Sequence, residues 1–165
     1  MSTRHTGNVR PATPSDVPEL IRLVRELAVY EKEPQAATAT EADFTASLFP
    51  PDGAPVAHAH VAEADGRVVG MALWFLSFST WTGRPGIWLE DLFVEPEHRG
   101  TGLGRELLAT LAALCVERGY TRLEWWVLNW NEPSIGFYRG LGAVSQDEWT
   151  TFRMDGDALQ RLGAR

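Results

Sequence analysis

The feature that most constrains this chain is the stretch from residue 89 to residue 104, where an apolar segment leads into a glycine-rich loop and then into a helical pattern. The apolar segment carries two adjacent carboxylates, Glu90 and Asp91. Glycines let backbone N–H groups turn toward one point, and the first turn of a helix adds unpaired N–H groups and the positive end of its dipole. The stretch therefore predicts a cradle for a pyrophosphate, built around Gly100, Gly102 and Gly104.

The spacing of the glycine loop narrows the kind of pyrophosphate. The loop lacks the Lys-Ser/Thr pair that closes the P-loop of NTP hydrolases, and its spacing G-x-G-x-G departs from the dinucleotide fingerprint G-x-G-x-x-G. It matches Arg/Gln-x-x-Gly-x-Gly/Ala through Arg99, Gly102 and Gly104, and in this it resembles the acetyl-CoA loop of the GNAT acetyltransferases. The alternative for the loop alone is a tight turn before an amphipathic helix.

Length and charge set broad limits on fold and partners. The chain has 165 residues, of which 44% are hydrophobic and 22% charged, so we expect one domain, residues 1–165, with a real core. The net charge of −7 and pI near 5.1 argue against a nucleic-acid binder and suit a cationic substrate. No apolar run approaches the length of a membrane span, so no membrane partner is expected.

The cysteine and histidine content points away from disulfides and metals. The single cysteine, Cys115, lies in an apolar helical stripe, which favours a buried core residue over a nucleophile. Residues 1–10 are polar and lack the apolar region of a signal peptide, so we expect a cytoplasmic protein. The histidines are scattered and predict no metal site, although His58 and His60 share one face of a strand, which is a weak zinc hint.

Periodicity and turn signals predict a mixed order of strands and helices. Hydrophobic spacing and caps predict helices over 13–31, 40–49, 103–118 and 131–140, with a loop at 33–39. They predict strands over 8–11, 56–62, 68–78, 87–94 and 122–128, and one or two closing strands within 143–154. This order indicates an α/β (α+β) domain with a central twisted sheet, mixed but mostly antiparallel, and helices on both faces.

Several blocks resemble the diamine and polyamine N-acetyltransferases of the GNAT superfamily, over nearly the whole chain. The blocks are 10–13, 26–31, 89–91, 99–104 and 130–138. The resemblance implies the GNAT fold and acetyl-CoA as co-substrate. The implied CoA-binding residues are Leu92, Phe93 and Val94 along the pantetheine arm, Arg99, Gly100, Thr101, Gly102, Leu103 and Gly104 around the pyrophosphate, and Asn131 and Ser134 on the other side.

The same resemblance implies two catalytic residues, Glu90 as proton acceptor and Tyr138 as general acid. A lysine-like amine has a pKa near 10.4, so about one in a thousand is neutral at pH 7, and a carboxylate can accept the proton that blocks its attack. A phenol of pKa about 10 suits protonation of the leaving thiolate. Without the resemblance, Glu90 reads equally well as a solvated strand residue and Tyr138 as core packing.

Residues 79–81 indicate which class of acceptor amine to expect. Ser79-Thr80-Trp81 replaces the Asp-Pro-Trp of typical polyamine enzymes and resembles the thialysine N-acetyltransferase branch, with one carboxylate fewer for a long polyamine. We therefore expect a thialysine-like or lysine-like amine or a short diamine, and family members suggest a homodimer. The candidate acceptor-binding residues are Tyr30, Glu31, Ser79, Trp81, Asp91, Asp147, Glu148 and Trp149, with either Asp147 or Glu148 as the late acid.

Two rival functions stay open at this point. One is acetylation of a protein lysine or N-terminus, which needs an open groove and is disfavoured by the many acids. The other is an acyl-CoA sensor without turnover, which has no need to keep Glu90 and Tyr138.

Overall fold

A computed structural model describes residues 8–164, in two compact units that meet in sequence between Trp126 and Val127. The first unit is built on a five-stranded sheet in the order β1-β2-β3-β4-β5. Every neighbouring pair is antiparallel except β4 and β5, which are parallel. The predicted mixed, mostly antiparallel sheet is thus confirmed. The strands are β1 Asn8–Pro11, β2 His58–Ala64, β3 Arg67–Ser79, β4 Arg84–Val94 and β5 Leu123–Trp125.

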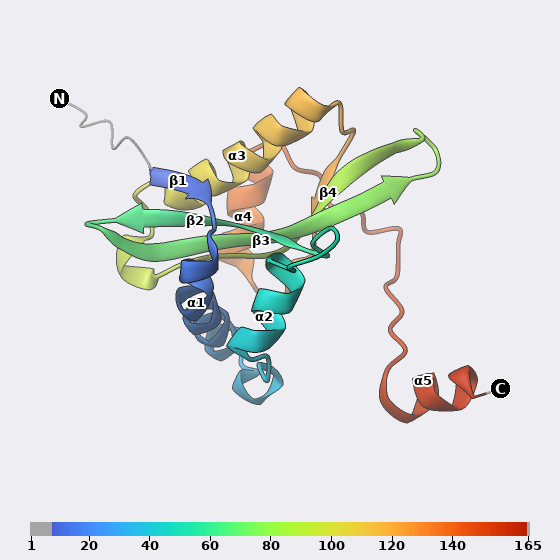
Figure 1. Ribbon diagram of the computed structural model, residues 1–165. Coiled ribbons are helices and arrows are strands. Elements are labelled where there is room, and N and C mark those ends of the chain that lie inside the picture. The colour runs from blue at the N-terminus through green and yellow to red at the C-terminus, as the bar shows by residue number, and fades with distance from the viewer. Residues whose placement is uncertain (1–7, 165) are drawn as a thin grey trace. The chain divides into compact units, whose positions relative to one another are not determined.

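Helices cover both faces of this sheet, as predicted. The long helix α1, Val17–Tyr30, and the short helix α2, Glu41–Leu48, lie on one face, and α3, Leu103–Arg118, lies on the other (Figure 1). Short 3-10 turns, η1 Pro14–Asp16, η2 Pro34–Ala36 and η3 Pro96–His98, join these elements. Among the described residues, no helix has both the length and the apolar character that a membrane span requires.

The main core lies between α1, α2 and the inner strands. Val61, Met71 and Phe93 are buried there beside Leu20 and Leu23 of α1. Leu23 is fully buried. The reason is that α1 contacts both the sheet and α2, so two sides of the helix are covered rather than one.

Local caps and turns follow the sequence closely. Thr40 and Asp43 form a reciprocal capping box at the start of α2, with the Asp43 N–H 3.2 Å from the threonine hydroxyl and the Thr40 N–H 2.8 Å from the carboxylate. Asp65 and Gly66 take φ values of 53° and 75° in the tight β2–β3 turn. Gly119 ends α3 at φ 69°.

The second unit contains α4, Glu132–Gly140, and α5, Gly156–Gly163. The prediction of closing strands within 143–154 is wrong, because the structure describes no strand there. The backbone hydrogen bonds of this segment are local, such as Ala143 N–H to Tyr138 O at 3.1 Å and Trp149 N–H to Gln146 O at 3.3 Å. A strand needs a neighbouring ladder, and no described strand pairs with this segment. The predicted strand over 122–128 is likewise shorter, whereas β4 begins three residues earlier than predicted.

Candidate active site

A β-bulge in the middle of β4 presents the first carboxylate of the site. Leu73 on β3 pairs with Asp91 and the next residue, Trp74, pairs with Leu89. Glu90 therefore has no opposite residue on β3. A bulge bends its strand and redirects a side chain, and bulges are common beside active sites. The bulge distinguishes Glu90 from an ordinary member of an alternating strand.

The Glu90 carboxylate is held at the surface by an indole. Trp88 Nε1 donates a hydrogen bond to Glu90 Oε2 over 3.0 Å. The Trp88 ring in turn meets the Trp126 ring edge-on, with centroids 5.1 Å apart. Glu90 itself is exposed, so a substrate can approach a carboxylate whose orientation is already restricted.

Asp91 is the most strongly perturbed carboxyl of the site. Burial raises the pKa of Asp91, and the nearby charges of Glu90 and Glu31 raise it further, to about 7. Burial also raises the pKa of Glu31, which follows the last residue of α1. The structure thus brings together three of the predicted acids around β4 and the end of α1. Such a cluster attracts a cation, which relieves the repulsion among the carboxylates.

The end of β4 also has a free edge on the side of β5. The β4–β5 pairing covers Ile87, Trp88 and Leu89 and stops at Trp125. Beyond that point Leu92 and Val94 pair with β3 but have no β5 partner among the described residues. Backbone groups on this edge can meet a ligand that lies along the strand, and contact of the pantetheine arm with Leu92, Phe93 and Val94 stays a prediction.

The glycine loop after β4 has the geometry of an anion cradle. Gly100 and Gly102 take φ values of 75° and 94°, which side chains rarely tolerate. A Cβ added at either position meets no heavy atom within 4 Å, so the space beside the loop is open. The first hydrogen bond of α3 runs from Glu106 N–H to Gly102 O over 3.0 Å, so earlier N–H groups have no acceptor within the helix. The residues present fit a pyrophosphate.

Arg99 has a role in this loop that its motif position does not reveal. Its Nε donates to the Val94 carbonyl over 2.9 Å. Its guanidinium carbon lies 5.0 Å from the centre of the Tyr30 ring and 5.4 Å from that of Phe93. Cation–π contacts of this kind fix the side chain. Arg99 therefore ties the loop to β4 and to the end of α1, and Tyr30 is engaged in that contact.

A buried ion network anchors the end of β4, and sequence reasoning missed it. Glu95 is buried and accepts hydrogen bonds from Arg22 over 2.6 Å and from Arg67 over 2.8 and 2.7 Å. Burial alone raises the pKa of Glu95, but these bonds outweigh it and hold the pKa below its ordinary value. The side-chain ligand atoms of Glu95, Glu97 and His98 lie within 4.8 Å of one another. Two arginines already neutralise the Glu95 carboxylate, so we assign no metal to this group.

The comparisons with known proteins agree with this geometry. The profile of the family described as "Acetyltransferase (GNAT) family" matches residues 20–143. The chain belongs to the GNAT acetyltransferase family. It is 36% identical over 168 residues to a thialysine N-epsilon-acetyltransferase of Bos taurus, covering 95% of this chain and 97% of that protein. It is 34% identical over 153 residues to the Caenorhabditis elegans protein of the same name, covering 91% and 92%.

Solved structures confirm the fold of this GNAT acetyltransferase. An integron cassette protein from the mobile metagenome of V. cholerae superposes with a TM-score of 0.80 at 23% identity, covering 97% of this chain and 99% of that one. An aminoglycoside acetyltransferase from an uncultured soil metagenomic sample superposes with a TM-score of 0.78 at 15% identity, covering 94% and 100%. GNAT acetyltransferases use acetyl-CoA as co-substrate, which is the pyrophosphate ligand that the loop suits.

Ser79 and Trp81 of the acetyltransferase lie away from the acids. Ser79 ends β3, is buried, and accepts a hydrogen bond from Thr82 N–H over 3.3 Å. Six strand positions separate it from Leu73, which pairs with Asp91, and at about 3.3 Å per residue this is roughly 20 Å. Trp81 is 86% exposed at the tip of the β3–β4 hairpin. Within one chain, the structure does not bring these two residues to Glu90.

The second unit carries the remaining predicted site residues. Asn131 is buried and caps α4, its Oδ1 accepting from Ser134 N–H over 3.4 Å. Tyr138 lies on α4, half-buried, with its ring 5.3 Å from that of Phe137. Asp147 accepts a hydrogen bond from Ser145 over 3.1 Å. Glu148 and Trp149 are exposed.

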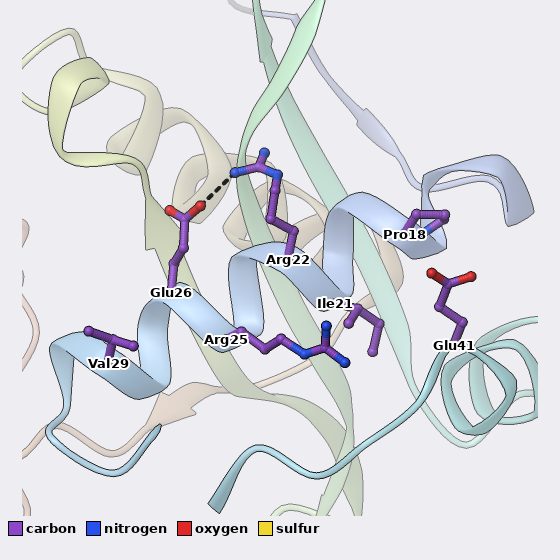
Figure 2. Close-up of a pocket in the computed structure, with 7 residues that line it drawn as sticks. All are labelled: Pro18, Ile21, Arg22, Arg25, Glu26, Val29 and Glu41. Atoms are coloured by element: carbon purple, nitrogen blue, oxygen red, sulfur yellow. Dashed lines mark hydrogen bonds and ion pairs between the residues drawn. The ribbon is translucent and has the colours of Figure 1, made fainter. Parts of the chain in front are cut away.

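A shallow groove of about 310 Å³ on the outer side of α1 is a separate feature of the acetyltransferase (Figure 2). Arg22 and Arg25 lie near it, and a 2.7 Å ion pair joins Arg22 to Glu26. The same Arg22 also binds Glu95, so its charge is neutralised. We assign no chemistry to this groove, which is lined by Pro18, Ile21, Arg22, Arg25, Glu26, Val29 and Glu41.

Proposed function

We propose that this enzyme transfers the acetyl group of acetyl-CoA to a primary amine of a small cationic acceptor, a thialysine-like or lysine-like amine or a short diamine. The observation that carries the proposal is the pair of acids at the β4 bulge, directly before an open glycine loop. The thialysine relatives, matched over nearly their full length, support the choice of acceptor. The net charge of −7 also favours approach of a cation.

The proposed reaction is a direct transfer. Glu90 takes a proton from the bound ammonium, directly or through water, and the neutral nitrogen then attacks the thioester carbonyl. The carbon–nitrogen bond forms first and gives a tetrahedral oxyanion, which backbone N–H groups at the free edge of β4 near Leu92 stabilise. The carbon–sulfur bond then breaks, and Tyr138 gives its proton to the departing thiolate. The second proton lost by the nitrogen restores the Tyr138 phenol, and the first proton passes from Glu90 to solvent.

Asp91 supports this reaction as a second carboxyl beside the base. Because its pKa is about 7, it changes charge around neutral pH. When ionised, it attracts the ammonium of the acceptor together with Glu31. Asn131 and Ser134 are proposed to contact CoA from α4, and Asp147 or Glu148 the acceptor.

The homodimer is proposed on the apolar surface of the β3–β4 hairpin. Leu76, Phe78 and Trp81 are 48%, 66% and 86% exposed on this hairpin. An exposed apolar patch of this kind marks an interaction surface. We also propose a cytoplasmic location, which suits a chain whose single thiol, Cys115, is free and buried.

A thiol-release assay with acetyl-CoA and a panel of amines tests the function. The panel contains thialysine, lysine, putrescine, spermidine, spermine and a lysine-containing peptide. We expect the highest kcat/KM for thialysine or lysine. A preference for the peptide would favour a protein acetyltransferase. Binding of acetyl-CoA without release of CoA by any amine would favour a sensor.

A further inference from the structure

A second cavity, of about 240 Å³, lies at the edge of the sheet where β1 ends and β2 begins. Its apolar walls come from Pro11 of β1, from Leu48 and Phe49 at the end of α2, and from Leu114 of α3. In the order of the sheet, β3 separates β2 from β4. The cavity therefore includes no residue of β4, although Trp74 on its floor pairs with Leu89 beside the bulge.

Two histidines and a tryptophan form the polar floor of the cavity. Trp74 Nε1 donates a hydrogen bond to His60 Nδ1 over 3.1 Å. Since Nδ1 is the acceptor, neutral His60 carries its proton on Nε2. No acceptor among the described residues takes this Nε2–H. The His58 ring stacks on Trp74, with centroids 4.4 Å apart and planes 23° apart. The floor therefore offers a flat aromatic surface and a hydrogen-bond donor with a fixed direction.

One cation stands on the wall of the cavity. Arg118, in the last turn of α3, lines the cavity and forms no ion pair with any residue that the structure describes. Two carbonyls at this helix end accept backbone hydrogen bonds, Cys115 O from Tyr120 N–H over 2.8 Å and Val116 O from Gly119 N–H over 3.4 Å. Burial lowers the pKa of both His58 and His60, and the charge of Arg118 lowers them further. Among residues 8–164, Arg118 and the two imidazoles are the only charged or titratable groups that line the cavity.

We propose that this cavity binds a small carboxylate with a flat apolar body, of the arylcarboxylate class. The planar fork of Arg118 matches a carboxylate, and the Nε2–H of His60 supplies a further donor. The apolar walls and the indole face accept an aromatic ring. A metal cation is disfavoured, because the cavity offers two imidazoles, one already engaged through Nδ1, beside a positive charge. Inorganic phosphate leaves the apolar walls without contacts.

Binding of such an anion is expected to depend on pH. In the free protein, burial and the charge of Arg118 hold the pKa values of both imidazoles below the ordinary value near 6.5. A bound carboxylate favours the protonated imidazole, so it raises these pKa values. By linkage, the anion then binds more tightly as the pH falls through the pKa values of the two imidazoles. For each imidazole, a rise of one pKa unit corresponds to about tenfold tighter binding at most, reached at pH values below the pKa of the free protein.

Nuclear magnetic resonance of the histidine ring C–H signals of the full chain tests the site, with benzoate as the probe at about pH 6 and about pH 8. We expect saturable shifts of the His58 and His60 signals and tighter binding at the lower pH. Arg118→Gln should weaken binding at least tenfold and Arg118→Lys by less, because lysine keeps the charge but loses the fork. Arg161→Gln, which removes the same charge from α5, should leave binding unchanged.

Other outcomes overturn the proposal. Equal binding of benzamide would show that the negative charge is not recognised, and equal binding of phosphate would exclude the arylcarboxylate class. Unchanged benzoate affinity in a folded Arg118→Gln protein would remove the central contact. Arg118 is exposed, so we expect the variant to keep its circular dichroism spectrum. Because the readout is binding and not turnover, the result is independent of the proposed acetyl transfer.

Discussion

The indole N–H of Trp88 holds the carboxylate of Glu90 at 3.0 Å, two residues along the same strand. In a regular strand, residues two apart share a face but stand about 6–7 Å from each other along the chain. The bulge that leaves Glu90 without a partner on β3 occurs at this point. The proposed base is therefore defined by a local distortion of β4 and by a neighbour that limits its rotation.

Loss of the Glu90 carboxylate should remove proton acceptance while the fold persists. We expect Glu90→Gln to lower kcat by about 10²–10⁴-fold, the usual contribution of a general base. Trp88→Phe should give a smaller loss, because the carboxylate remains but is less restricted. Steady-state kinetics with thialysine measure both effects, with Glu41→Gln as a control on α2. If Glu90→Gln turned over like the wild type, Glu90 would be a solvated strand residue.

The raised pKa of Asp91 predicts two pH effects with a defined sign. Its pKa is about 7 in the folded chain and about 3.9 when unfolded. Between these values the unfolded state has already released the proton, so this group destabilises the fold progressively as the pH rises from about 4 to about 7. Asp91→Asn should therefore raise Tm more at pH 8 than at pH 5. Thermal unfolding at both pH values checks this, with exposed Asp52→Asn as control.

The same residue should shape the pH dependence of the reaction. Ionised Asp91 attracts the ammonium, so kcat/KM should rise as the pH increases through about 7. In Asp91→Asn this rise should be lost, while any rise caused by other groups remains. An identical pH profile in the variant would show that Asp91 takes no part in the reaction.

A side chain at Gly102 should disturb acetyl-CoA binding. Gly102 has a φ of 94° in the loop, with open space beside it. Gly102→Val places a branched side chain where the phosphates approach, and we expect the KM for acetyl-CoA to rise well above tenfold. Gly53 has a similar φ of 82° in a different loop, so Gly53→Val separates backbone strain from loss of the cradle. Unchanged acetyl-CoA kinetics in folded Gly102→Val would contradict the cradle.

The role of Tyr138 can be separated from its packing. Tyr138→Phe removes the phenolic proton but keeps the ring that lies beside Phe137. We expect kcat to fall by about 10²–10⁴-fold while acetyl-CoA affinity stays nearly intact. Tyr120→Phe, which removes a phenol after α3, is the matched control. A wild-type rate in Tyr138→Phe would leave protonation of the thiolate to water or to another group.

Ser79 bears on acceptor choice through its distance from the acids. We expect a higher kcat/KM for thialysine, lysine or putrescine than for spermidine or spermine, and Ser79→Asp should move activity toward the polyamines. Ser79 lies roughly 20 Å along the sheet from Asp91. A charge introduced there by Ser79→Asp therefore acts on the far end of a long acceptor or on the site of a second copy. Gel filtration of the variant, beside the kinetic comparison, distinguishes an effect within one chain from an effect across a dimer.

A preference for spermine in the wild type would contradict this expectation. Unchanged kinetics in Ser79→Asp would show that the residue serves only the turn, where it accepts a hydrogen bond from Thr82. Aspartate keeps that acceptor and is favoured at the first position of such a turn, so the variant is expected to fold.

Features that depend on neighbours in the chain could be predicted from the sequence. The glycine loop, the Thr40 capping box, the Asp65–Gly66 turn and the end of α3 at Gly119 all follow from residues within a few positions of one another. The strand–loop–helix order and the motif spacing also led to the family, which the comparisons confirm. The two adjacent acids on β4 could be named for the same reason.

Features that join distant segments could be seen only in the folded chain. The bulge at Glu90 depends on the register between β3 and β4. The contact of Arg99 with Tyr30 depends on where α1 ends, and the burial of Leu23 depends on the position of α2. The acid cluster at Asp91 needs Glu31, sixty residues away in the sequence. The wrong prediction of closing strands has the same cause, because apolar alternation shows that a segment can extend but not whether a partner strand is there to pair with it.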